Sequence, residues 1–113
     1  ILAGAGRPPP DPLSVLLAEA AIVPPEQARI ALLARRAGMG ETAFRANVRT
    51  RLGRGPREHI ERLRLERAAY ALRTTDLPIS DIAAAAGYAD PFHFARAFRR
   101  VQGISPSGFR VGR

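Results

Sequence analysis

The chain repeats itself, and this duplication limits the folds that it can adopt. Residues 33–39, LARRAGM, align with residues 82–88, IAAAAGY, at an offset of 49 positions. Downstream, Phe44 aligns with Phe94 at an offset of 50, so the second copy has one extra residue in its turn. Each copy predicts a helix, a glycine-containing turn and a second helix, which is the helix-turn-helix pattern.

The residue types at each turn have a physical reason. Ala34 and Ala83 are small, which allows two helices to approach closely. Gly38 and Gly87 are placed to end the first helix of each copy, and we expect them in a left-handed conformation that residues with a Cβ resist. An ordinary helical hairpin would show the same features, but two copies favour helix-turn-helix units with a shared role.

Composition favours an all-α protein with an anionic partner. The 113 residues allow one domain or two very small ones. Hydrophobic residues make up 46% of the chain and many are alanine, whereas no alternating pattern predicts a sheet. The formal net charge is +8, and all 18 basic residues are arginine. Such a balance in so small a chain indicates a polyanion as the partner.

Apolar periodicity and turn residues together predict about seven helices. The chain divides into a linker or tail at 1–12, a first helix-turn-helix unit at 13–55, a linker helix at 56–73 and a second unit at 74–113. Within these limits the expected helical segments are Leu13–Ile22, Glu26–Ala37, Glu41–Leu52, Arg57–Arg73, a helix that is capped by Ser80 and ended by Gly87, Asp90–Arg100, and at most one turn at Ser107–Arg110.

The segment 90–100, DPFHFARAFRR, predicts a helix with two different faces. Asp90 is a good N-cap, and the proline after it suits the first helical position. Phe94 and Phe98 recur at helical spacing and are expected to face a core. Arg96 points about 200° away from Phe94, at about 100° per residue. A buried aromatic stripe with an outward arginine face suits a helix that enters a DNA groove.

Several classes of function are excluded by what the sequence lacks. There is no cysteine for a disulfide or a thiolate metal site, and we expect no metal and no cofactor. No paired-carboxylate site, Ser/His/Asp or Cys/His set, or phosphate-binding glycine loop is present, so an enzyme is not expected. No apolar run reaches the about 20 residues that span a membrane. We therefore expect a cytoplasmic, nucleoid-associated protein.

The run LRLERAAYALRTTDLPISDIAAAAGYADPFHFARAFRRVQGISPSGFR resembles the signature region of the DNA-binding domain of AraC/XylS-type bacterial transcription regulators. The resemblance covers residues 13–110 and is strongest over 64–110. It implies seven helices, with recognition helices at 41–52 and 91–100 that enter successive major grooves of double-stranded DNA, and it favours an activator. A linker helix of 17 residues would be about 25 Å long, which is compatible with the about 34 Å repeat of the duplex.

The resemblance also implies which residues contact DNA. Arg96 is the best base reader, because an arginine donates two hydrogen bonds to guanine, worth about 1–3 kcal/mol of discrimination. The base-reading candidates are Thr42, Arg45 and Ala46 in the first unit and Pro91, Phe92, Ala95 and Arg96 in the second. Phosphate contacts are expected from Arg49, Arg99 and Arg100.

The first unit departs from the family pattern at four positions. Gly40 stands where a serine usually caps the recognition helix, and Ala46 where an outward arginine is usual. Val48 replaces an aromatic residue, and Arg29 occupies a position where a helix cap is expected. We therefore expect the first unit to be less tightly packed and the second to carry most of the sequence specificity.

Two further points about partners stay open. A helical adaptor module that binds a protein such as RNA polymerase would also present charged helices, and a steep fall of binding with salt would distinguish DNA binding from it. The start, ILAGAGRPPPDP, has three consecutive prolines and no initiating methionine. It suggests a linker that follows an effector-sensing or dimerisation domain, so that the chain would be the output module of a regulator.

Overall fold

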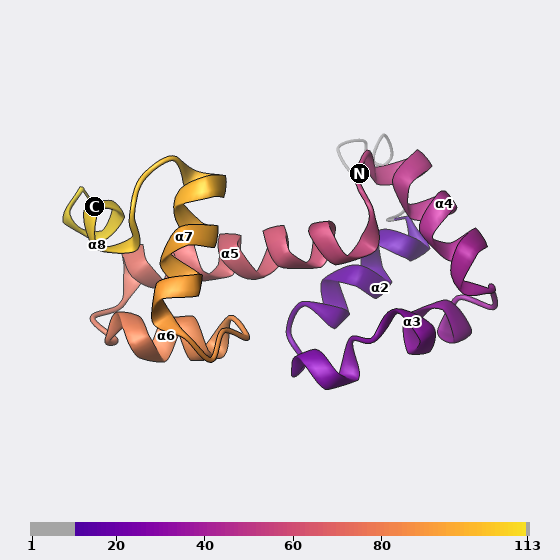
Figure 1. Ribbon diagram of the computed structural model, residues 1–113, viewed down its shortest axis with the longest axis horizontal. Coiled ribbons are helices and arrows are strands. Elements are labelled where there is room, and N and C mark those ends of the chain that lie inside the picture. The colour runs from indigo at the N-terminus through magenta and orange to yellow at the C-terminus, as the bar shows by residue number, and fades with distance from the viewer. Residues whose placement is uncertain (1–10, 113) are drawn as a thin grey trace, which may run out of the picture. The chain divides into compact units, whose positions relative to one another are not determined.

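The structure is a computed structural model that describes residues 11–112, and within them all regular secondary structure is helical. The elements are α2 (Pro12–Ala20), the 3₁₀ helix η1 (Pro25–Gln27), α3 (Ile30–Arg36), α4 (Glu41–Leu52), α5 (Pro56–Thr74), α6 (Ile79–Ala85), α7 (Pro91–Gln102) and α8 (Pro106–Val111) (Figure 1). The predicted all-α fold of about seven helices is confirmed. None of these helices is long and apolar enough to cross a membrane.

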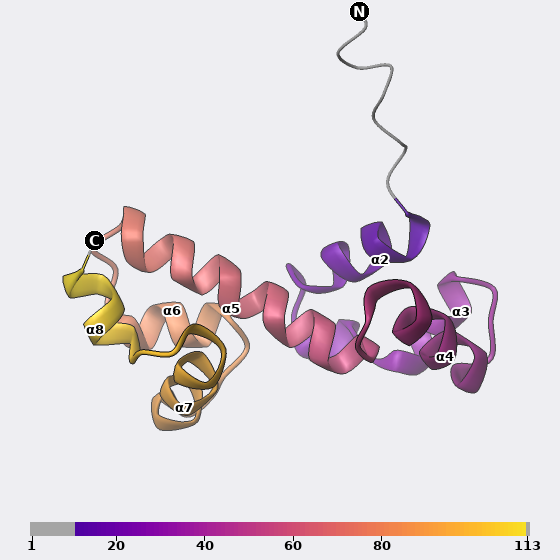
Figure 2. The same ribbon diagram turned by 90° about the horizontal axis from the view of Figure 1, so that it is seen from above.

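The chain divides into two compact units, with the boundary between Pro56 and Arg57. Helices α2, α3 and α4 belong to the first unit, and α6, α7 and α8 to the second. Almost the whole of α5 groups with the second unit, where α6, α7 and α8 gather beside its C-terminal half (Figure 2). Each unit therefore contains one helix-turn-helix pair, α3–α4 or α6–α7.

The two turns have the same backbone geometry. Gly38 has φ +73° and Gly87 has φ +93°, as predicted for left-handed positions at the ends of α3 and α6. The backbone N–H of the next residue in each copy donates to the carbonyl five residues earlier, from Met39 to Ala34 at 2.9 Å and from Tyr88 to Ala83 at 3.0 Å. This bond is the mark of a Schellman ending. The sequence repeat is thus a repeat of conformation.

The apolar stripes predicted for the first unit are buried. Its buried side chains include Leu13, Leu16, Leu17, Ala20, Ile30, Leu33, Ala34, Phe44 and Val48. They come from α2, α3 and α4 at helical spacing, so each helix places one apolar face against the others.

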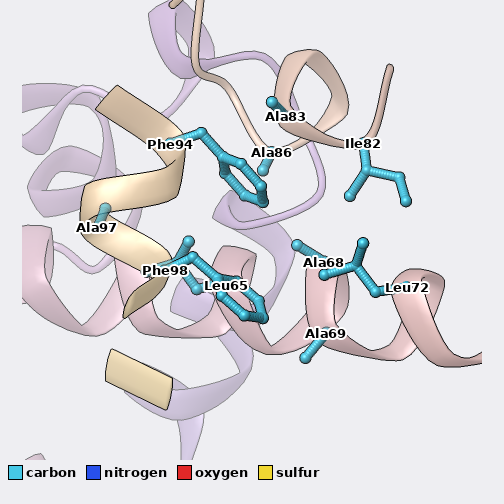
Figure 3. Close-up of a cluster of buried hydrophobic side chains, with 10 residues drawn as sticks. All are labelled: Leu65, Ala68, Ala69, Leu72, Ile82, Ala83, Ala86, Phe94, Ala97 and Phe98. Carbon is cyan, nitrogen blue, oxygen red and sulfur yellow. The ribbon is translucent and has the colours of Figure 1, made fainter. Parts of the chain in front are cut away.

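The second unit has a core of aromatic and aliphatic side chains from α5, α6 and α7. Phe94, Ala97 and Phe98 of α7 project towards α5 and α6 (Figure 3). The side chains they meet are Leu65, Ala68, Ala69 and Leu72 of α5 and Ile82, Ala83 and Ala86 of α6. Small residues on α5 and α6 leave room for the two phenylalanine rings, which fix the face that α7 turns inward.

The N-terminal caps of α4 and α7 differ as expected. The Asp90 carboxylate accepts the backbone N–H of Phe92 at 2.9 Å at the start of α7. At the start of α4 the N-cap is Gly40, which offers no side-chain acceptor. Both helices end at a left-handed glycine, Gly53 with φ +83° and Gly103 with φ +85°. Helix α4 therefore lacks a side-chain cap that α7 has.

One predicted helix start in the first unit is wrong, and another differs by one residue. The expected helix Glu26–Ala37 is a short 3₁₀ turn followed by α3, because Arg29 has extended backbone angles and serves as the N-cap without a side-chain bond. The expected linker at 1–12 lies outside the described residues up to position 10, but α2 already begins at Pro12. The Asp11 carboxylate accepts the backbone N–H of Leu13 at 2.9 Å and caps it.

Two predicted boundaries in the second unit are also wrong. Ser80 does not cap α6, because Pro78 with its extended ψ of 143° takes the N-cap position and Ser80 is already helical. The segment predicted as at most one turn is the six-residue helix α8. Ser105 caps it by accepting the backbone N–H of Gly108 at 3.1 Å, and Pro106 suits its first position.

Candidate functional site

The outer face of α7 carries the residues that were predicted to read bases in the second unit. Pro91, Phe92 and Arg96 are exposed, and Ala95 is partly buried. Phe92 is 75% exposed although it is aromatic and lies two residues from the buried Phe94. A large ring left in solvent beside an arginine is a contact surface that the core does not use.

Two arginines on α7 have no partner among residues 11–112. Arg96 and Arg99 are exposed, and neither forms a hydrogen bond or an ion pair with the described part of the chain. Their guanidinium groups therefore keep all their donors for an external acceptor. This is the arrangement that a base-reading or phosphate-binding arginine needs.

The arginines on the outer face of α4 make more contacts within the chain than Arg96 and Arg99 do on α7. Thr42, Arg45 and Ala46 are exposed, but the Arg45 guanidinium lies 3.4 Å from the Glu41 carboxylate one turn away. Arg49 is exposed, and its guanidinium lies 3.6 Å from the point that a Cβ on Gly55 would occupy. An exposed pair one helical turn apart is worth about 0.3–0.5 kcal/mol, so Arg45 can leave it at little cost.

A polar cluster of Glu61, Tyr88 and Arg100 joins three elements of the second unit. The Tyr88 hydroxyl donates to Oε2 of Glu61 at 2.6 Å, and the Arg100 guanidinium donates to Oε1 at 2.9 Å. Arg100, predicted as a phosphate contact, is thus held by one nitrogen and stays 63% exposed. The bonds of Glu61 to Tyr88 and Arg100 were not predicted, because these partners lie 27 and 39 residues away and no periodicity links them.

Burial raises the pKa of Tyr88 well above the usual range of a phenol, and the hydrogen bond to Glu61 and the charge of that carboxylate raise it further. Arg100 and Arg64 oppose the shift. The folded state therefore keeps a proton that the unfolded chain releases near pH 10. The contribution of Tyr88 to stability is complete below about pH 10 and is lost as the pH rises above it.

A tyrosine titration checks this pH dependence. The chain has two tyrosines and no tryptophan, so Tyr70→Phe leaves Tyr88 as the single chromophore of this kind. We expect tyrosinate absorbance in this variant to appear clearly above pH 10, together with loss of helical signal. The free energy of unfolding should fall over the same range. Ionisation of Tyr88 near pH 10 in a folded protein would contradict the expectation, and Tyr70→Phe/Tyr88→Phe is the blank.

Within residues 11–112 no group of three His, Asp or Glu side chains is placed to hold a metal ion. The chemistry that the exposed faces of α4 and α7 offer is hydrogen-bond donation from positively charged planar groups. Guanidinium groups bind phosphate and the acceptor edge of guanine in this way. These two faces are therefore the candidate site.

Comparisons with known proteins agree with the helix-turn-helix fold. A family model described as a helix-turn-helix domain matches residues 33–111. The chain is 33% identical over 81 residues to an AraC-like transcription regulator of Streptomyces antibioticus, which covers 72% of the chain and 27% of that protein. It is 43% identical over 61 residues to the transcriptional activator RhaS of Escherichia fergusonii, which covers 54% of the chain and 22% of RhaS.

Among solved structures, the DNA-binding domain of the transcriptional factor AdpA, crystallised with a target DNA, is similar over its length. It shares 30% identity with a TM-score of 0.79, and the match covers 91% of this chain and 93% of that one. The curated relatives are much longer, and the chain spans only about a quarter of their length. The relatives and neighbours are transcription regulators and not enzymes, which confirms the prediction made from the missing catalytic sets.

Proposed function

We propose that this chain, which belongs to the AraC/XylS-type family of helix-turn-helix transcription regulators, binds specific sequences of double-stranded DNA. The observation that carries the proposal is the free arginine pair on α7. Arg96 and Arg99 have no partner among the described residues and lie on the face opposite a fully buried aromatic stripe. A core that fixes the helix and an outer face with unused donors are what base reading needs.

In the proposed complex, α4 and α7 enter successive major grooves. Thr42, Arg45 and Ala46 face bases in one groove, and Pro91, Phe92, Ala95 and Arg96 face bases in the other. Arg49, Arg99 and Arg100 bind phosphates. At 1.5 Å per residue the 19 residues of α5 are about 28 Å long, a length suited to the about 34 Å repeat of the duplex.

The wider role is proposed from the family. One relative, RhaS, is a transcriptional activator, and the chain matches only a part of it. We place this chain in the cytoplasm as the output domain of an activator. An effector or dimerisation domain would supply the signal, and RNA polymerase would be the partner at the promoter.

A salt titration tests the proposal. Binding to a duplex selected from a random pool is measured at increasing salt, and log K is expected to fall steeply with log salt. Three phosphate contacts alone give a slope of about −2.7. Arg99→Gln should reduce the magnitude of the slope by about 1 and weaken binding to all duplexes alike.

The matched controls are a scrambled duplex and Glu66→Gln, which changes an exposed side chain on α5. Equal affinity for selected and scrambled duplexes would remove the claim of sequence specificity. A slope near zero, or binding to RNA polymerase in the absence of DNA, would instead favour the adaptor module.

A further inference from the structure

We infer that Glu61 is a positioning residue that sets the orientation of α7 for base reading. The inference rests on the proposed function of α7. One carboxylate on α5 accepts from two donors on different elements, the Tyr88 hydroxyl in the α6–α7 turn and the Arg100 guanidinium on α7. Both oxygens of Glu61 are used, at 2.6 Å and 2.9 Å.

The two donors hold α7 at both of its ends. The Tyr88 ring meets His93 and Phe94 edge-on, with centroids 5.3 Å and 5.6 Å away, and so contacts the N-terminal half of α7. Arg100 lies in the last turn of the same helix. Glu61 is therefore linked to the N-terminal half through a packed ring and to the C-terminal end through an ion pair.

This link restrains rotation of α7 about its own axis, a motion that apolar packing resists only weakly. Phenylalanine side chains and small residues form the contacts of α7 with α5 and α6, and such contacts have no direction. Hydrogen bonds do have direction, so two of them on one carboxylate oppose rotation of α7 about its axis. A rotation of about 10° would move a long side chain such as Arg96 by about 1 Å, which is enough to spoil a bidentate contact with a base.

A similar contact occurs in the first unit, although its arginine is one position away from the repeat equivalent of Arg100. Asp11 lies 50 positions before Glu61, and its carboxylate accepts from the Arg51 guanidinium at 2.9 Å. Arg51 is in the last turn of α4, as Arg100 is in the last turn of α7. The first copy has no side-chain donor in the turn, because Met39 stands where the second copy has Tyr88, and the other donor to Asp11 is the backbone N–H of Leu13. Each unit thus has a carboxylate that pairs with an arginine in the last turn of α4 or α7, and only in the second unit does this carboxylate also accept from a side chain in the preceding turn.

The positioning effect of Glu61 on DNA binding can be distinguished from the effect of its negative charge. Removing any carboxylate near DNA reduces repulsion from phosphates and strengthens binding to every sequence alike. Positioning acts only on the preferred sequence. The informative quantity is therefore the specificity ratio, the affinity for the preferred duplex divided by the affinity for one whose α7 half-site is scrambled.

The experiment measures this ratio for the whole chain and three variants, using the half-site that Arg96→Ala relaxes. Glu61→Gln is expected to lower the ratio about fivefold without weakening binding to the scrambled duplex. Tyr88→Phe, which removes one donor and keeps the ring, should lower it about twofold. Glu66→Gln removes the same charge from an exposed position on the same helix and should leave the ratio unchanged.

The outcomes separate this inference from the proposed function. A wild-type ratio well above one that is the same in Glu61→Gln and Tyr88→Phe would overturn the positioning role alone. A wild-type ratio of one would overturn both. If Glu61→Gln does not fold by circular dichroism, Tyr88→Phe decides, because a fall in its ratio supports the role and an unchanged ratio contradicts it.

Discussion

Replacing Phe98 with alanine is expected to destabilise the second unit by about 3–5 kcal/mol. The side chain is fully buried, and its ring lies 5.7 Å from that of Phe94 and 5.4 Å from that of Phe109. The substitution removes the ring from the centre of the core and leaves a cavity between α7 and α5. For a unit of this size the midpoint of thermal unfolding should fall by about 15–30 °C, measured by circular dichroism.

Phe92→Ala is the matched control, because it makes the same chemical change on the same helix. Phe92 is 75% exposed, so its loss should change the free energy of unfolding by no more than about 0.5 kcal/mol. Equal losses of stability in the two variants would show that the face of α7 assigned to the core is wrong. That result would also remove the basis for placing Arg96 on the outer face.

The faces of the helices could be predicted from the sequence because they depend on local periodicity. Phe44 and Val48 on α4, and Phe94 and Phe98 on α7, repeat every four residues and are fully buried. The turn glycines were predictable for a similar reason, because a left-handed position strongly favours a residue without a Cβ.

Helix starts were harder to predict, because several neighbouring residues compete to cap them. Ser80 is a good N-cap in isolation, but Pro78 fixes an extended backbone two residues earlier and the helix begins there. Asp11 was assigned to a linker although it caps α2 and pairs with Arg51, 40 residues away. A cap of this kind is chosen by the backbone geometry of a few residues and by tertiary partners, neither of which appears in a hydrophobic pattern.

The sequence also could not predict which arginines form ion pairs with carboxylates. Arg96 and Arg100 are one turn apart on α7 and have the same side chain, yet only Arg100 meets a carboxylate. The difference depends on where α5 places Glu61. Arg45 on α4 likewise meets Glu41, whereas Arg96 has no acid one turn before it, since that position is Phe92. Whether an arginine forms an ion pair or keeps its donors unused therefore depends on these neighbouring residues.

Arg96→Ala is therefore expected to weaken binding to the preferred duplex by about 10- to 100-fold and to relax the preference at one base pair. Its guanidinium has no partner within the described residues, so no intramolecular hydrogen bond or ion pair is broken when it binds a base. Arg45→Ala should cost less, because Arg45 must first give up its pair with Glu41 and sits on the unit whose recognition helix has no side-chain cap.

Selection of bound duplexes from a random pool with each variant measures both effects. Wild-type protein should select two half-sites about one helical turn apart, and Arg96→Ala should lose preference in one of them only. Arg45→Ala should relax the preference in the other half-site by a smaller factor, because Arg45 also pairs with Glu41. If Arg45→Ala relaxes sequence preference more than Arg96→Ala, then the first unit is the main reader, and the free arginine pair on α7 serves phosphate binding instead.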